Sequence, residues 1–353
     1  MKLKKLIINF LMISTITLFS WIVIDFSVTL LLGVRGFSQF FESDKMVGHI
    51  NKANFSGNFG GPLDDFYSSV NIDKFGARKS SFSNCPSPQN KIIFLGDSVT
   101  AGFEVNDDQT FVSIINKNCG EKNIIGYNFG VRAHDTHSVI GNYLRVGEKI
   151  DHNSVYYLIS LNDLSENLQI YHYKNLVKRF GRIFNGLYVE PNTNFFEKIY
   201  FSFRLLISDK FYLTTKILTF KNLFKNKKNY YKDDIKIKLS IKEIQKLEYL
   251  YELILKLNFE VKKKQSNLSV AFSPNQCFIR DKILCLLHEQ WMIKKINENK
   301  NDFKIHSIIK EVYELNKDEE FSLETLRFKR DLHLSIKGHK LIGDLIYNFY
   351  ENN

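Results

Sequence analysis

The chain has 353 residues, of which 44% are hydrophobic and 25% are charged. These proportions exclude an intrinsically disordered protein, and the length accommodates one large α/β domain with additions. A net charge of +11 is compatible with a polyanionic partner, and lysines cluster between Lys221 and Lys232 among aromatic residues. Charge alone would allow nucleic acid binding, but an anionic membrane surface agrees better with the N-terminus.

The N-terminus carries an apolar run from Leu6 to Ile24, preceded by three lysines, and a second apolar stretch follows Asp25. The first run has about the 20 residues that a bilayer requires. Lysines before the run predict a cytoplasmic N-terminus and export of the remainder. Residues 1–35 are therefore predicted to form an uncleaved signal anchor. A cleavable signal peptide is the main alternative, although no small-x-small cleavage site ends the run, and a buried core helix is the third.

Four cysteines fit either an oxidising or a reducing compartment. If the chain is exported, Cys277 with Cys285 and Cys85 with Cys119 are plausible disulfide pairs, although spacing alone proves neither. The sequence has neither a CxxC motif nor a Cys/His cluster that would indicate zinc. No cofactor or metal is predicted.

Short apolar runs alternate with helical patterns from Lys91 onward, as in consecutive βα units. Before them, residues 36–90 are predicted to be a linker followed by one or two strands that pack onto the domain. The alternation is interrupted by residues 171–238, a long basic and aromatic stretch that predicts a helical insertion or lid. The predicted strands are residues 92–95, 124–129, 155–160, 268–272 and 303–308, and the predicted helices are residues 111–118, 138–146, 241–261, 284–296 and 338–350.

The motif GDSVTAG, residues 96–102, follows the first predicted strand directly. Ser98 therefore lies where a buried strand ends and a helix begins, at the edge where open α/β folds bind ligands. Gly96 and Gly102 allow the backbone to turn, and Asp97 can cap the helix. Because Gly-Asp-Ser is also a common turn sequence, this motif alone leaves a purely structural role open.

Three further segments place polar groups at the same edge. Gly130 follows the second strand and could offer a bare backbone N–H, and Asn162 follows the third and could offer its carboxamide. With the Ser98 amide, these groups predict an oxyanion hole. His333, just before the last helix, is the candidate general base, and Asp331 shares its face of an extended segment and can orient its ring.

Other polar residues near these segments have more ordinary interpretations. His339 is predicted to be a solvated residue at the start of the last helix, and Asp163 can cap a turn. Arg132 could bind a substrate anion or pair with a surface acid, and the sequence does not choose between them.

The four blocks GDSVTAG, NFG, LND and DLHLSIKGH resemble those of the SGNH hydrolase superfamily, also called GDSL esterases and lipases, in the same chain order. The resemblance covers residues 91–352 apart from the insertion. It implies a flavodoxin-like three-layer α/β/α sandwich with a parallel sheet, and ester chemistry through an acyl-serine without a cofactor. The chain departs from the usual family pattern, which has its acid three residues before the histidine, because position 330 is Arg330 and Asp331 is the nearest acid.

Together these features predict a membrane-anchored serine esterase whose domain, residues 91–352, lies outside the cytoplasm. Its expected substrate is an acyl ester, plausibly O-acetyl, of a glycan or a lipid. Two alternatives stay open: an O-acyltransferase with the same triad, and a catalytically silent glycan-binding protein tethered to the membrane. The sequence does not give the oligomeric state.

Overall fold

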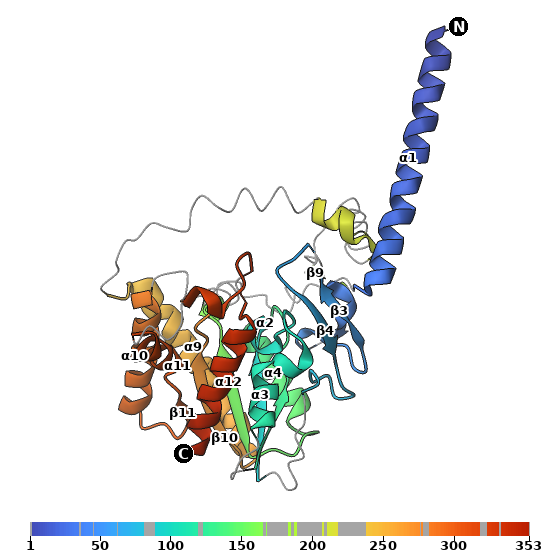
Figure 1. Ribbon diagram of the computed structural model, residues 1–353. Helices are drawn as coiled ribbons and strands as arrows, with labels where there is room; N and C mark the ends of the chain where they lie inside the picture. Colours follow the sequence, from blue (N-terminus) through green and yellow to red (C-terminus); the bar gives the residue numbers. More distant parts are fainter. Residues whose placement is uncertain are drawn as a thin grey trace.

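The computed structural model describes most of the chain (Figure 1). The described residues are 2–34, 37–44, 46–61, 63–80, 89–118, 123–164, 167, 183–184, 187–188, 207, 210–217, 238–275, 277, 282–317, 323–331 and 333–352. The Cys85–Cys119 pair, the lysine cluster at 221–232 and most of the predicted insertion lie outside these residues.

A five-stranded parallel sheet forms the centre of the protein. The spatial order β11-β10-β7-β5-β6 is the 2-1-3-4-5 order of flavodoxin-like folds when these strands are renumbered along the chain. This topology confirms the predicted fold class. The strands are β5 (Asn90–Gly96), β6 (Ile124–Asn128), β7 (Ser154–Ile159), β10 (Asn267–Phe272) and β11 (Lys304–Ile305).

Helices cover both faces of the sheet, and alternating side chains of each strand meet different helices. On β5, Ile93 and Leu95 belong to a core cluster with residues of α4, α9 and α10, whereas Ile92 and Phe94 belong to a cluster with residues of α3, α11 and α12. The covering helices are α3 (Phe111–Lys117), α4 (Thr136–Val146), α9 (Ile241–Lys263), α10 (Lys282–Glu298), α11 (Ile308–Lys317) and α12 (Ile336–Glu351).

The segment between the N-terminal helix and the sheet forms two antiparallel hairpins. These are β1 (Phe41–Asp44) with β2 (Gly48–Asn51), and β3 (Ser56–Gly60) with β4 (Tyr67–Asn71). Their buried side chains share a third apolar cluster with residues that follow β5 and β6. The segment is therefore more structured than the predicted linker with one or two strands, because its aromatic residues pack against the main domain.

The N-terminal helix α1 (Lys2–Leu32) leaves the domain on the side where α2 (Ser98–Ala101) lies (Figure 1). Within the described chain it is the one helix long and apolar enough to cross a membrane, as either an anchor or a signal sequence. Of the predicted insertion, the structure describes the strand pair β8 (Ile183–Phe184) with β9 (Leu187–Tyr188) and a helical stretch over residues 212–217. The limits of the predicted domains and the lid role stay predictions.

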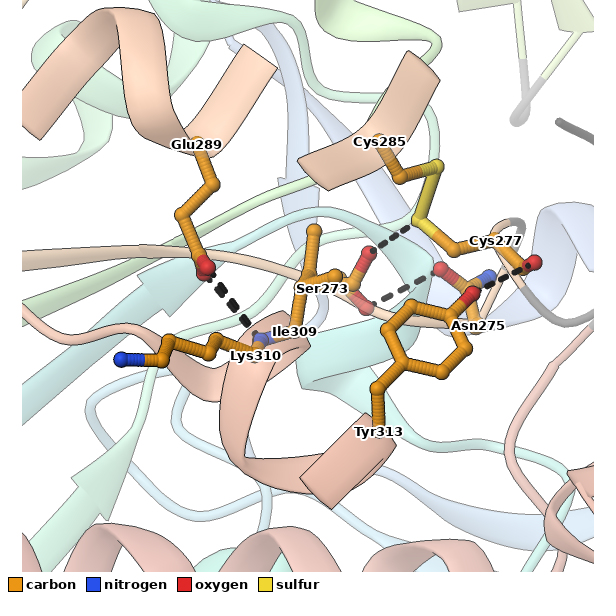
Figure 2. Close-up of a disulfide and its surroundings, with 8 residues drawn as sticks. All are labelled: Ser273, Asn275, Cys277, Cys285, Glu289, Ile309, Lys310 and Tyr313. Atoms are coloured by element: carbon orange, nitrogen blue, oxygen red, sulfur yellow. Dashed lines mark hydrogen bonds between the residues drawn. A yellow bond between two sulfur atoms is a disulfide. The ribbon is translucent and has the colours of Figure 1, made fainter. Parts of the chain in front are cut away.

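A disulfide joins Cys277 and Cys285, which lie between β10 and the first turns of α10 (Figure 2). Both cysteines are buried, and the Tyr313 hydroxyl donates to the Cys277 carbonyl oxygen at 3.0 Å. This is one of the two disulfides considered from the sequence.

Changing both Cys277 and Cys285 to alanine should lower the free energy of unfolding by about 2–3 kcal/mol, because the bridge closes a short loop. The two cysteines are 8 positions apart. Denaturant unfolding of the purified chain in detergent measures the change. The control is the unmutated protein treated with reductant, and its free energy of unfolding should fall by a similar amount. An unchanged midpoint in both experiments would contradict a structural role for the bridge.

Candidate active site

Ser98 stands at the junction of β5 and α2, as the motif predicts. Asp97 caps α2 by accepting a hydrogen bond from the Val99 amide at 2.9 Å. Gly102 ends the helix in the left-handed region, with φ of 59°. At Gly96 a Cβ atom would lie 2.8 Å from the Leu158 carbonyl oxygen, so only glycine fits this turn between packed strands.

The serine hydroxyl faces an imidazole from the far end of the chain. Ser98 Oγ lies 2.7 Å from His333 Nε2. Asp331 Oδ1 accepts hydrogen bonds from the His333 amide, at 2.8 Å, and from His333 Nδ1. With Nδ1 protonated, Nε2 is left to accept the serine proton. The structure thus brings together the three residues that the sequence predicts as nucleophile, base and orienting acid.

A second carboxylate, which the sequence analysis missed, lies beside the same imidazole. Glu104 is buried, and its Oε1 is 3.3 Å from His333 Nδ1. It also forms an ion pair with Arg132. The Arg132 guanidinium lies 5.0 Å from the centre of the Phe59 ring, on the hairpin β3–β4. The sequence contains one signal for the Glu104–Arg132 pair, which is that the acid Glu104 lies between two apolar residues, Phe103 and Val105.

The electrostatics of the site raise the pKa of His333. Burial is the strongest single influence and lowers this pKa, and the Arg132 charge lowers it too. The Glu104 charge, together with the hydrogen bond and charge of Asp331, outweighs them and raises the pKa above its ordinary value. For Asp331, burial raises the pKa, yet the bonds to His333 and its charge lower it below the usual value. The site therefore favours a charged His333 beside an ionised Asp331.

Changing Glu104 to glutamine should shift the acidic limb of the activity profile to lower pH. Hydrolysis requires neutral His333, so activity falls as pH drops through the His333 pKa. Because the Glu104 charge raises that pKa, its removal lowers the pH at which activity is lost. The measurement is kcat/KM for p-nitrophenyl acetate across pH 5–8.

Glu289→Gln is the matched control, since Glu289 is also a buried glutamate but belongs to α10, where it accepts from the Ile309 and Lys310 amides (Figure 2). Its profile should coincide with that of the unchanged protein. An acidic limb that stays in place for Glu104→Gln would contradict the assigned influence on His333.

The two predicted oxyanion residues lie on the loops after β6 and β7, the two strands that flank β5 in the sheet. The Gly130 amide donates to Asn128 Oδ1 at 3.0 Å, and a Cβ at Gly130 would come within 2.3 Å of the Ala101 amide nitrogen. Asn162 lies half-buried in the turn after β7. Ala133, on the Gly130 loop, has φ of 59°, a costly conformation for a residue other than glycine. The roles of Gly130 and Asn162 in an oxyanion hole stay predictions.

Arg78, from the segment before β5, holds the turn that follows Ser98. Its side chain is buried and donates to the carbonyl oxygens of Ala101, at 2.9 Å, of Gly102 and of Val105. It also pairs with Asp107 at 3.1 Å, and its amide donates to the Asn128 carbonyl oxygen at 2.8 Å. One side chain therefore ties the N-terminal segment to the loops of the site.

The structure contradicts the prediction for His339, confirms the one for Asp163, and pairs Arg132 with an acid. His339 is not solvated: it is 1% exposed, and its Nδ1 accepts from the Phe111 amide. The prediction was wrong because α12 packs its first turn onto α3, and burial lowers the His339 pKa to about 3. Asp163 Oδ2 accepts from the Ser160 amide at 3.3 Å, as a turn cap does. Arg132 pairs with an acid, but a buried one.

Glu104, Asp331 and His333 place possible ligand atoms within 4.8 Å of one another. Glu104 Oε1 pairs with Arg132, and Asp331 Oδ1 accepts from His333. Glu104 Oε2 is buried and has no hydrogen-bond partner among the described residues. The second imidazole nitrogen faces Ser98. The set is thus arranged for proton transfer to and from the serine, and the absence of a cofactor stays a prediction.

A scan against protein-family models finds no match for this chain, and a search of curated proteins finds none either. Solved structures give similar folds at low identity. A lipolytic protein of the G-D-S-L family from Veillonella parvula is 12% identical with a TM-score of 0.40, covering 74% of this chain and 99% of its own. The esterase EstA from a Pseudoalteromonas species is 13% identical with a TM-score of 0.39, covering 75% and 100%.

The acetylxylan esterase Axe2 from Geobacillus stearothermophilus, solved as a catalytic mutant, is 12% identical with a TM-score of 0.39, covering 74% of this chain and 94% of its own. These identities are low, so the chemistry of this chain is argued from its own residues. In fold, the chain is similar to G-D-S-L lipolytic proteins and to acetylxylan esterases.

Proposed function

We propose that this chain is a serine esterase of the SGNH type. The observation that carries the proposal is the continuous hydrogen-bonded series from Ser98 Oγ through His333 to Asp331. A serine hydroxyl is a weak nucleophile unless a base within hydrogen-bond reach takes its proton. A half-buried Ser98 at a strand end, with a base oriented by a carboxylate, meets that requirement.

The proposed reaction has two halves. Ser98 Oγ attacks the ester carbonyl while its proton passes to His333 Nε2, and Asp331 and Glu104 stabilise the imidazolium that forms. The tetrahedral oxyanion collapses, the alcohol leaves with the proton from His333, and the acyl group stays on Ser98. Water then gives a proton to His333 and attacks the acyl carbon, releasing the acid and restoring Ser98. The proposed oxyanion donors are the Ser98 amide, the Asn162 carboxamide and the Gly130 amide, which would exchange its hydrogen bond to Asn128 Oδ1 for one to the oxyanion.

The proposed location is the outer side of a membrane, with α1 as an uncleaved anchor. Lysines before the apolar run favour a cytoplasmic N-terminus. The disulfide between Cys277 and Cys285 supports an oxidising compartment for the domain, since disulfides are rare in reducing cytosol. The substrate we propose is an acyl ester, O-acetyl in particular, on an extracytoplasmic glycan or lipid.

A sugar hydroxyl in place of water would make the same site an O-acyltransferase. The test is to supply the full chain in detergent with p-nitrophenyl acetate, with and without an oligosaccharide acceptor, and to follow nitrophenol and acetylated sugar. Nitrophenol release that needs Ser98, without acetylated sugar, supports the esterase. Acetylated sugar in place of free acetate supports the transferase. If the Ser98→Ala variant releases nitrophenol as fast as the unchanged protein, both the esterase and the transferase are overturned. A catalytically silent binding protein would then be the remaining alternative.

A further inference from the structure

The last turns of α1 are part of the folded protein. Asp25, fully buried on this helix, accepts hydrogen bonds from the Leu213 and Thr214 amides, both at 2.8 Å, and from the Thr214 hydroxyl at 2.6 Å. Thr29 Oγ1 accepts from the Tyr212 amide at 2.9 Å. The helical stretch 212–217 therefore begins on a carboxylate that α1 supplies, and Figure 1 shows it in yellow beside the lower part of α1.

The C-terminal end of α1 is also held by the hairpin β3–β4. Asn58 Nδ2 donates to the Leu32 carbonyl oxygen at 3.0 Å, and the Asn58 amide donates to the Gly33 carbonyl oxygen at 3.2 Å. A helix bound at both its side and its end has a fixed direction relative to the domain. It is neither a free tether nor a segment that can be removed without exposing these groups.

The length of the apolar run places these contacts at a definite depth. Leu6 to Ile24 spans about 28 Å at 1.5 Å per residue, close to the roughly 30 Å hydrocarbon core of a bilayer. Asp25 then falls where the hydrocarbon ends, which is where a carboxylate is tolerated. Residues 211–217, which bind to α1 at Asp25 and Thr29, place Phe211, Tyr212 and Lys216 at the boundary between hydrocarbon and headgroups. Aromatic and basic side chains are typical of this membrane interface. Phe211 itself packs 6.3 Å from the Phe26 ring, centre to centre.

A series of contacts leads from this level to the catalytic loop. The Tyr212 hydroxyl accepts from the Leu63 amide at 2.9 Å, and Lys216 pairs with Asp64 at 2.5 Å. The next residue, Asp65, pairs with Arg330 at 2.6 Å. Arg330 directly precedes Asp331, so few residues separate the membrane level from the acid that orients His333.

We propose that the catalytic edge of the sheet is held against the outer surface of the bilayer, and that the site takes its ester from an amphiphile that lies in that surface. The substrate part of this proposal rests on the proposed esterase function, whereas the orientation does not. Lipid esters and lipid-linked glycan esters share this presentation, with the acyl ester at headgroup depth.

The orientation is tested by tryptophan quenching in vesicles of phosphatidylcholine and phosphatidylglycerol. The chain has 2 tryptophans, and Trp21→Phe with Trp291→Phe gives a background without them. This background loses the hydrogen bond from Trp21 Nε1 to Thr214 Oγ1, at 3.0 Å, and keeps the three bonds to Asp25. Phe211→Trp reports the proposed interface. Phe259→Trp is the matched control, since Phe259 is 62% exposed on the part of α9 that precedes β10, at the opposite edge of the sheet. Lipids carrying a nitroxide near the headgroup should quench the first variant strongly and leave the second unquenched. Equal quenching would overturn the orientation.

The substrate class is tested with two esters and the unchanged full chain in the same vesicles. One ester is water-soluble p-nitrophenyl acetate, and the other is 4-methylumbelliferyl palmitate dissolved in the bilayer. Asp25→Ala removes the docking of residues 212–217 and should reduce hydrolysis of the bilayer ester roughly tenfold, because substrate and site lose their alignment. Hydrolysis of the soluble ester should not change.

Thr15→Ala is the control on α1, because Thr15 bonds only within its own helix among the contacts described for it, and it should leave both rates unchanged. Equal losses on the two esters in Asp25→Ala would contradict presentation from the bilayer. If the unchanged chain hydrolyses neither ester, the esterase proposal fails, and the quenching experiment still decides the orientation. The two candidate substrates are distinguished by supplying each in the vesicles and measuring the acyl group released. Release from an acylated lipid-linked glycan but not from a diacyl lipid would identify the glycan ester as the substrate.

Discussion

Hydrolysis of p-nitrophenyl acetate should fall by about 10⁴-fold or more in kcat when either Ser98 or His333 is changed to alanine. Without Ser98 Oγ no acyl-enzyme forms, and without His333 the hydroxyl that lies 2.7 Å from its Nε2 has no base. The KM should change little, because neither side chain is proposed to bind the ester in its ground state. Stopped-flow or steady-state release of nitrophenol measures both constants.

The Ser98→Ala/His333→Ala double variant should lose no more than either single variant, because residues that act as one unit are not additive. His137→Ala is the control: His137 lies on α4 and bonds to the Tyr249 hydroxyl at 3.0 Å, and its loss should leave kcat within a few-fold. Losses in the two single variants that multiply in the double variant would show that Ser98 and His333 act independently, contrary to the mechanism.

Changing Arg78 to methionine should lower the free energy of unfolding by about 3–5 kcal/mol, the usual cost of removing one partner from a buried charged network. Methionine keeps much of the volume but leaves the carbonyl oxygens of Ala101, Gly102 and Val105 without their donor. Asp107 also loses its ion pair. Thermal and denaturant unfolding of the full chain in detergent measure the loss.

Arg330→Met is the matched control for stability, because Arg330 makes its ion pair with Asp65 from an exposed position. Exposed ion pairs contribute about 0–1 kcal/mol, so this variant should unfold almost as the unchanged protein does. Similar losses in the two variants would contradict the assigned role of Arg78 in holding the loops of the site.

The parts of the fold that local pattern controls could be predicted from the sequence. The run before GDSVTAG is strand β5, and the alternation that follows it predicts the remaining strands. The last strand is shorter than the predicted 303–308, because Ile308 begins α11, a helix that the pattern did not predict. The two-residue spacing of Asp331 and His333 predicted that their side chains could meet, and the structure has them hydrogen-bonded, although at bends and not in an extended segment. In each case the signal lies within a few residues along the chain.

What could not be predicted depends on contacts between distant residues. Glu104 acts on His333 across 229 positions of sequence, at 3.3 Å in space, and its own neighbours in the chain indicate only burial. Arg78 lies in a polar stretch whose hairpins gain their stability from packing on the domain. His339 was expected in solvent because its helix start is polar, whereas the approach of α12 to α3 buries it.

Covalent labelling tests the central claim most directly, which is that Ser98 is a nucleophile activated by His333. The full chain in detergent is treated with a fluorophosphonate probe, and the modified residue is identified by peptide mass spectrometry. We predict one modified serine, Ser98, with labelling that is lost in Ser98→Ala and strongly slowed in His333→Ala. A modified residue other than Ser98, or equal labelling of the His333→Ala variant, would contradict the account.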